Sequence, residues 1–209
     1  MDYSEKQAQI METAEQLFAD QGFNGTSVRD IAEKAGVNLA MISYYFGSKE
    51  KLLEAIFDNR GKKAKLTLED IVQKPGHTSL QKVYLLIDHY IEKIMNQQCF
   101  HRILAREQVL NNTDAISKLI LEMKKRNLEI IRRLIEEGQK NGEFRKNVNI
   151  PLMVSTMVGT ASNVVTSKFY YRELSNLQHL SDDEYQQYIR KQLSQHLKSL
   201  FKIMLTDEA

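Results

Sequence analysis

The stretch 26–51 constrains the fold of this chain more than any other part of it. Ser27, with Asp30 three positions later, is a start signal for a helix. Gly36 can take the left-handed conformation that ends a helix and turns the chain sharply. Asn38 is then placed to cap a second short helix. The pattern predicts two short helices that meet at a tight turn.

The second of these helices has a clear inner and outer face. Ile42 and Phe46 are four residues apart and should point inward. The outward positions are then Leu39, Ala40, Ser43 and Tyr44. A short helix held across another by a glycine turn, with such residues outward, fits the major groove of DNA. Spacing alone leaves a second interpretation open, because helix–glycine–helix pairs also occur in all-α proteins that bind no DNA.

A wider set of residues supports the DNA-binding interpretation. It comprises Ile10, Ala14, Leu17, Phe18, the pair 22–23, the run 26–32, the run 35–37 and the run 44–52. Over this first quarter, the chain closely resembles the DNA-binding domain of the TetR/AcrR family of bacterial regulators. Beyond it, only the general architecture of that family matches.

The resemblance implies an all-α fold with an N-terminal three-helix helix-turn-helix domain and a larger C-terminal helical domain for ligand binding and dimerisation. The corresponding boundaries are 1–48 for the DNA-binding domain, 49–74 for a connecting helix and 75–209 for the C-terminal domain. A continuous fourth helix, capped by Ser48, can transmit a shift between the two. Further helices are expected at 80–97, 100–110, 115–140 and 151–174, and from Asp182 to near the C-terminus.

Bulk composition suits a cytoplasmic helical protein. The chain has 209 residues, two prolines and no tryptophan, and the single Cys99 cannot form an internal disulfide. The N-terminal residues contain no apolar signal segment. The charge-free run 147–167 is too polar for a membrane span and is expected to be a helix buried against protein.

The charge of the DNA-binding region opposes the DNA interpretation when it is taken alone. The first 60 residues contain six Lys or Arg and ten Asp or Glu, a net charge of −4. The stretch 34–51 contains three lysines and one glutamate. Because local placement of charge decides phosphate affinity, we expect DNA binding with modest non-specific affinity.

The candidate DNA contacts fall into two groups. Tyr45, Lys49, Thr26 and Ser27 should contact phosphate, which positions the protein without reading sequence. Arg29 can reach a guanine edge or a phosphate, or it is a solvated surface residue. Base contacts are assigned to Leu39, Ala40, Ser43 and Tyr44 of the recognition helix, and its cap Asn38 is included among the DNA-binding residues. Leu39 and Ser43 depart from the commoner family pattern, and apolar Leu39 and Ala40 suit contact with a thymine methyl group.

The family resemblance also implies a small-molecule inducer bound among the central helices. The candidate lining residues are Tyr84, Tyr90, Met95, Phe100, His101, Met123, Met153, Met157 and Phe169. Each can equally be an ordinary core residue. Such a methionine-rich, aromatic set suits adaptable apolar or aromatic ligands.

Small and apolar residues near the C-terminus are candidates for a dimer interface. They are Ser155, Gly159, Ser162, Ile189, Leu193, His196, Leu200 and Met204. Intrachain packing explains the spacing equally well. The resemblance favours a homodimer, whose two recognition helices would lie about 34–36 Å apart, or a multiple of that distance, on a near-palindromic operator.

Two other functions compete with that of a transcriptional regulator. An enzyme is disfavoured because the five histidines show no metal-ligand spacing and no catalytic motif is present, so no cofactor or metal is expected. A helical protein-interaction module with a non-functional DNA-binding segment is the second alternative. The sequence therefore predicts a DNA-binding repressor that a small-molecule inducer releases.

Overall fold

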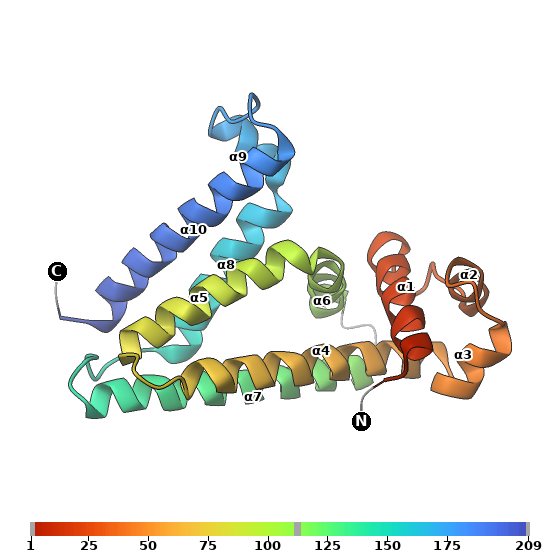
Figure 1. The fold of residues 1–209 in the computed structure, drawn as a ribbon, viewed down its shortest axis with the longest axis horizontal. Helices are drawn as coiled ribbons and strands as arrows, with labels where there is room; N and C mark the ends of the chain where they lie inside the picture. The colour runs from red at the N-terminus through yellow and green to blue at the C-terminus, as the bar shows by residue number, and fades with distance from the viewer. Residues whose placement is uncertain (1–2, 111–113, 208–209) are drawn as a thin grey trace. The chain divides into compact units, whose positions relative to one another are not determined.

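The computed structural model describes residues 3–110 and 114–207, and these ranges form helices with no strand (Figure 1). The predicted all-α class is confirmed. Packing divides the chain into two compact units. The first unit consists of the residues up to Lys65 with Gln97–Lys125, and the second consists of Leu66–Asn96 with the residues from Arg126 onward. The boundaries drawn from sequence at 48 and 74 concern function and stay a prediction.

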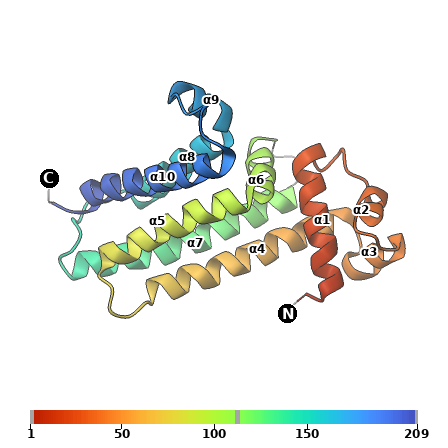
Figure 2. The same cartoon turned by 45° about the horizontal axis from the view of Figure 1, so that its top comes forward.

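The first unit contains the predicted helix-turn-helix. Its helices are α1 (Glu5–Gln21), α2 (Val28–Lys34), α3 (Leu39–Phe46), the first part of α4 (Lys49–Val72), α6 (Gln98–Leu110) and the start of α7 (Asp114–Lys140). Ser4 and Gln7 form a capping box at the start of α1, and Gly22 caps its end with φ +80°. Helix α6 packs against α1 (Figure 2).

An apolar core joins α1, α4 and α6 within this unit. Phe18, Phe57 and Phe100 are all at most 2% exposed, and the ring centroids of Phe57 and Phe100 lie 5.1 Å apart. Beside them, the Arg60 guanidinium donates to both oxygens of the Glu15 carboxylate at 3.0 and 2.8 Å. This bidentate pairing compensates the burial of Glu15 and fixes α4 against α1.

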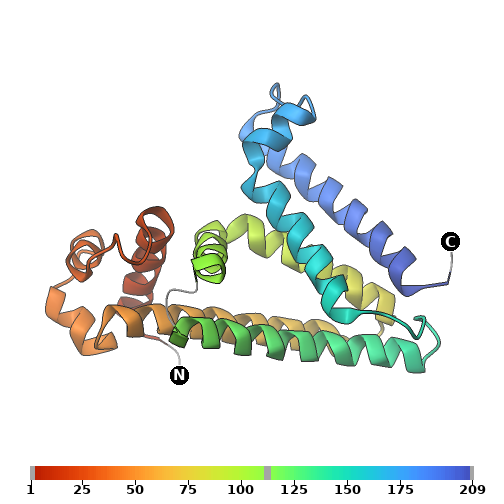
Figure 3. The ribbon, with the colours of Figure 1, turned by 180° about the vertical axis from the view of Figure 1, so that it is seen from behind.

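The second unit is a helical bundle around its own core. Its members are the end of α4, α5 (Ser79–Asn96), the rest of α7, α8 (Ile150–Thr166), α9 (Lys168–Leu174) and α10 (Asp182–Leu205). Helix α5 packs against both α8 and α10 (Figure 3). Ile87, Leu134, Ala161 and Leu197 are fully buried at this core. Ser181 and Glu184 form the capping box that starts α10.

The helix predicted over 151–174 is wrong in one respect, because the structure divides it into α8 and α9 at Ser167. The Thr166 hydroxyl donates to the backbone carbonyl of Ser162 at 2.7 Å. Such side-chain bonds to the preceding turn compete with regular helix geometry. Met153 and Met157 of α8 are buried in protein, as expected for this charge-free run, and no helix in the described residues is long and apolar enough to cross a membrane.

Candidate nucleic-acid interface

Helix α3 exposes the face that the sequence assigned to base reading. Ile42 is 1% exposed and holds the inner side of the helix in the core. On the outer side Leu39 is 42% exposed and Tyr44 85% exposed, and Ala40 and Ser43 are also exposed. An 85% exposed tyrosine on a folded surface is available to a partner such as a base edge or a sugar.

Capping interactions fix the first turn of each helix of the α2–α3 pair. The Asn38 side chain accepts from the Ala40 backbone N–H at 2.9 Å and starts α3. The Ser27 hydroxyl accepts from the Asp30 N–H, while the Asp30 carboxylate accepts from the Ser27 N–H at 2.8 Å. The bond from the Ser27 backbone N–H lowers the pKa of Asp30 below its ordinary value, because it stabilises the charged carboxylate. Gly36 makes the turn with φ +61°, as predicted.

Helix α1 supports the turn from below. The Gln9 side-chain amide donates to the Ala35 carbonyl at 2.9 Å, directly before Gly36. Ile31 and Ala32 of α2 are buried in the same core as Ile42. The turn angle between α2 and α3 is therefore fixed by contacts on its inner side, and the outer side remains open.

The prediction that the Thr26 side chain contacts phosphate is wrong. Its side chain is 1% exposed, and its hydroxyl donates to the Gly22 carbonyl at 2.9 Å, with Leu17 O at 3.3 Å. A hydroxyl with its hydrogen inside the fold cannot face a phosphate. Thr26 instead closes the loop between α1 and α2.

The other predicted phosphate contacts differ in how accessible they are. Ser27 and Arg29 are exposed, although the Ser27 hydroxyl is occupied as a cap. Tyr45 is half-buried and makes an edge contact with Tyr44, with ring centroids 5.3 Å apart. Lys49 is half-buried, and its ammonium donates to the Phe23 and Thr26 carbonyls at 2.9 Å each.

The sequence reasoning did not single out Lys51. Its side chain is 66% exposed in the first turn of α4 and pairs with Glu54 at 2.7 Å. Lys51 is thus more exposed than Lys49, whose ammonium is bound by two backbone carbonyls. The signal was present in the sequence as a second lysine two positions after the predicted contact.

The nine predicted ligand-lining residues do not all belong to one unit. Tyr84, Tyr90, Met95, Met153, Met157 and Phe169 lie in the second unit, whereas Phe100, His101 and Met123 lie in the first. Of these, Met95, Met153 and Met157 are at most 9% exposed, and burial raises the pKa of Tyr90 to about 12. The prediction that Phe169 lines the pocket is wrong. Its side chain is 69% exposed, because the break at Ser167 places it on the outer surface of α9.

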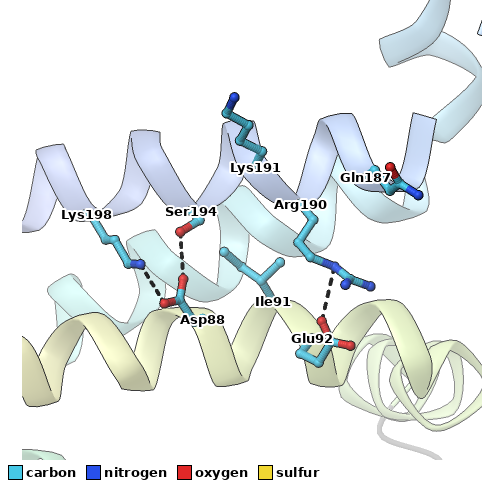
Figure 4. A pocket seen from close by; sticks show the side chains of 8 residues that line it. All are labelled: Asp88, Ile91, Glu92, Gln187, Arg190, Lys191, Ser194 and Lys198. Atoms are coloured by element: carbon cyan, nitrogen blue, oxygen red, sulfur yellow. Dashed lines mark hydrogen bonds and ion pairs between the residues drawn. The ribbon is translucent and has the colours of Figure 1, made fainter. Parts of the chain in front are cut away.

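A groove of about 350 Å³ lies between α5 and α10 and was not predicted (Figure 4). Four of the five charged residues that line it pair with one another. The Asp88 carboxylate accepts from the Ser194 hydroxyl at 2.6 Å and from the Lys198 ammonium at 2.5 Å, and Arg190 pairs with Glu92 at 3.1 Å. These bonds cross from one helix to the other, so they fix the packing of α5 on α10.

The predicted dimer residues also divide into two groups. Ile189 and Leu193 are at most 4% exposed and pack into the core of their own chain, and Leu200 and Met204 are half-buried against it. Ser155, Gly159 and His196 are exposed, and Ser162 is half-buried. The intrachain interpretation therefore explains the apolar stripe of α10, and the surface open to a second copy consists of the smaller and more polar residues.

This arrangement defines a helix-turn-helix protein with an exposed recognition helix and a separate helical unit. The model of the family described as "Bacterial regulatory proteins, tetR family" matches residues 10–56, and the model described as "YsiA-like protein, C-terminal region" matches residues 63–191. The chain belongs to the TetR family, and it is a DNA-binding transcriptional regulator.

Three similar proteins illustrate the relationship. "Probable HTH-type transcriptional regulator YttP" of Bacillus subtilis is 34% identical over 138 residues, which is 65% of either chain. The fatty acid metabolism regulator protein of the same species is 28% identical over 163 residues, covering 78% of this chain and 82% of the relative. The structure of the regulator FadR from Bacillus subtilis in complex with stearoyl-CoA shares the fold, with a TM-score of 0.68, 22% identity and coverage of 92% and 97%.

The internal role of Thr26 can be tested by substitution. Thr26→Val keeps the shape but removes the buried hydroxyl, so we expect the free energy of unfolding to fall by about 1–3 kcal/mol. Thr26→Ser keeps the hydroxyl and should lose less. Urea unfolding of the three proteins measures the difference, and equal stability of Thr26→Val and the unmodified protein would contradict the internal role.

Proposed function

We propose that the protein represses transcription by binding a near-palindromic operator as a homodimer, and that a small molecule releases it. The observation that carries this proposal is the exposed outer face of α3, above all Tyr44, on a helix whose inner face and ends are fixed. A rigid helix with an open outer face is the element that enters a major groove in helix-turn-helix proteins. The proposed setting is the cytoplasm, where DNA is accessible.

The outer surface of α8 supports the homodimer. Helix α8 has no charged residue, although Leu152 is 62% exposed and Val158 38% exposed. An exposed helix face in water usually carries charges. A Cβ added at Gly159 would meet no atom within 4 Å, so a second helix can approach the backbone closely there. We therefore propose that Ser155, Gly159 and Ser162 contact a second copy of the chain.

The proposed ligand has a long apolar part. Met95, Met153 and Met157 lie together in the core of the second unit. Methionine is flexible and polarisable, so a core rich in it can rearrange around an apolar chain. The stearoyl-CoA bound by FadR of Bacillus subtilis is a molecule of this class. Helix α4 is the proposed lever, since its residues belong to both units.

A ligand can release the operator only by binding more tightly to a state that does not fit DNA. Release therefore requires two arrangements of the recognition helices, of which only one matches the half-site spacing. The rival interaction module would show no salt-dependent association with DNA, which separates it from a regulator.

The operator is sought first, by selecting genomic fragments bound by the purified full-length protein. We expect a short palindrome. Tyr44→Ala should weaken binding to it by about 1–3 kcal/mol, because Tyr44 lies on the face assigned to base contacts. Fluorescence anisotropy at two salt concentrations measures this, with Val109→Ala, at an 83% exposed position of α6, as control. Binding no better than to random DNA would reject the proposal.

The dimer is tested by charge at the α8 surface. Gly159→Glu should produce monomers in sedimentation experiments and weaken operator binding, because two carboxylates would meet across the two-fold axis without intrachain overlap. Ala105→Glu, which adds the same charge at an exposed position of α6, is the control. An unchanged dimer in Gly159→Glu would exclude this surface as the interface.

The ligand class is tested by adding stearoyl-CoA to the protein bound to its selected fragment. We expect operator affinity to fall at least fivefold, which corresponds to about 1 kcal/mol of coupling. Coenzyme A without the acyl chain is the control and should have no effect. No change at saturating stearoyl-CoA would direct the search to other ligand classes.

A further inference from the structure

The loop between α1 and α2 presents several backbone carbonyls at one point. Gly22 ends α1 with φ +80°, and the Thr26 hydroxyl and Thr26 N–H donate to the Gly22 and Phe23 carbonyls at 2.9 and 3.3 Å. The carbonyls of Phe23 and Thr26 are oriented toward the start of α4, where they accept from Lys49. The loop thus offers two acceptors to one cation.

Lys49 occupies this point fully. Its ammonium donates to Phe23 O and Thr26 O at 2.9 Å each, and it lies 4.2 Å from the centroid of the Phe23 ring. Two of its three N–H groups are therefore used within the fold. The negative face of the aromatic ring adds a further attraction for the charge.

These contacts connect the two ends of the DNA-binding pair. Thr26 immediately precedes Ser27, the cap of α2. Two residues, Gly47 and Ser48, separate the end of α3 from Lys49, the first residue of α4. The Lys49 side chain thereby connects the residues just before α2 to the residues just after α3.

We propose that Lys49 is a positioning residue for DNA binding: it holds the α2–α3 pair in the orientation that fits the groove, and a phosphate contact is not its main contribution. This inference rests on the operator binding proposed above. It assigns the phosphate-neutralising role at this corner to exposed groups such as Lys51.

Salt dependence separates the two roles. A lysine that neutralises one phosphate contributes about 0.9 to the slope of the logarithm of affinity against the logarithm of salt concentration. A positioning residue changes affinity at every salt concentration and leaves the slope unchanged. The probe is the tightest-binding genomic fragment selected by the unmodified full-length protein.

The main variant is Lys49→Met, which keeps an apolar chain on Phe23 but removes the donors. The control is Lys51→Met, which removes the same charge from the same turn without touching the loop. We expect Lys49→Met to bind at least tenfold more weakly than Lys51→Met at all salt concentrations, with the slope of the unmodified protein. A slope less steep by about 0.9, with the loss vanishing at high salt, would overturn the proposal in favour of a phosphate contact.

Two further variants keep the test decisive if Lys49→Met does not fold, as judged by circular dichroism. Phe23→Leu leaves every charge in place but removes the aromatic ring that the Lys49 ammonium contacts, so we expect weaker operator binding with an unchanged slope. Lys49→Arg keeps the charge in a planar group that cannot reproduce the ammonium geometry, and it should restore less than half of the lost affinity on a logarithmic scale. Unchanged binding by Phe23→Leu, or full restoration by Lys49→Arg, would overturn the positioning role. If the unmodified protein itself showed no sequence-specific DNA binding, the proposed function would be rejected instead.

Discussion

The eight-residue recognition helix depends on the core beneath it. A helix of this length is not stable alone in water, because the cost of its nucleus exceeds what so few backbone bonds return. Ile42 is its fully buried residue, and Asn38 and Gly47 fix its two ends. The surface offered to DNA is therefore only as rigid as the contacts that α1, α2 and α4 make with that inner side.

Polar contacts, in addition to the apolar core, hold α4 against the earlier part of the chain. The Glu15–Arg60 pair and the bonds from Lys49 to the α1–α2 loop each join α4 to residues far earlier in the chain. Both use charged donors with two acceptors, which restrict orientation more than apolar contact does. Together these contacts restrict how α4 can lie against α1 and the α1–α2 loop.

The packing of α6 on α1 places α6 in the first compact unit. From sequence, α6 belonged to the C-terminal domain, whereas its residues share a core with the DNA-binding helices, with Phe100 against Phe57. Residues of α4 and α7 contribute to both units. A ligand that moves α6 would therefore act on the DNA-binding unit through its own core, which gives the proposed release a route beside α4.

The sequence by itself determined the α2–α3 pair, its caps and the outward face of α3, because these depend on spacing between near neighbours: Ser27 with Asp30, Gly36, and Ile42 against Tyr44. Where a residue type suits two environments, the sequence does not tell which of the two its side chain occupies. Thr26 and Lys49 are polar enough for a phosphate, and only tertiary structure decided that their donors meet carbonyls of the α1–α2 loop. Ile189 and Leu193 likewise suit a dimer or a core, and the packing of α10 on α5 placed them in the core. Which partner a side chain meets depends on the three-dimensional path of the chain, and local spacing does not contain that path.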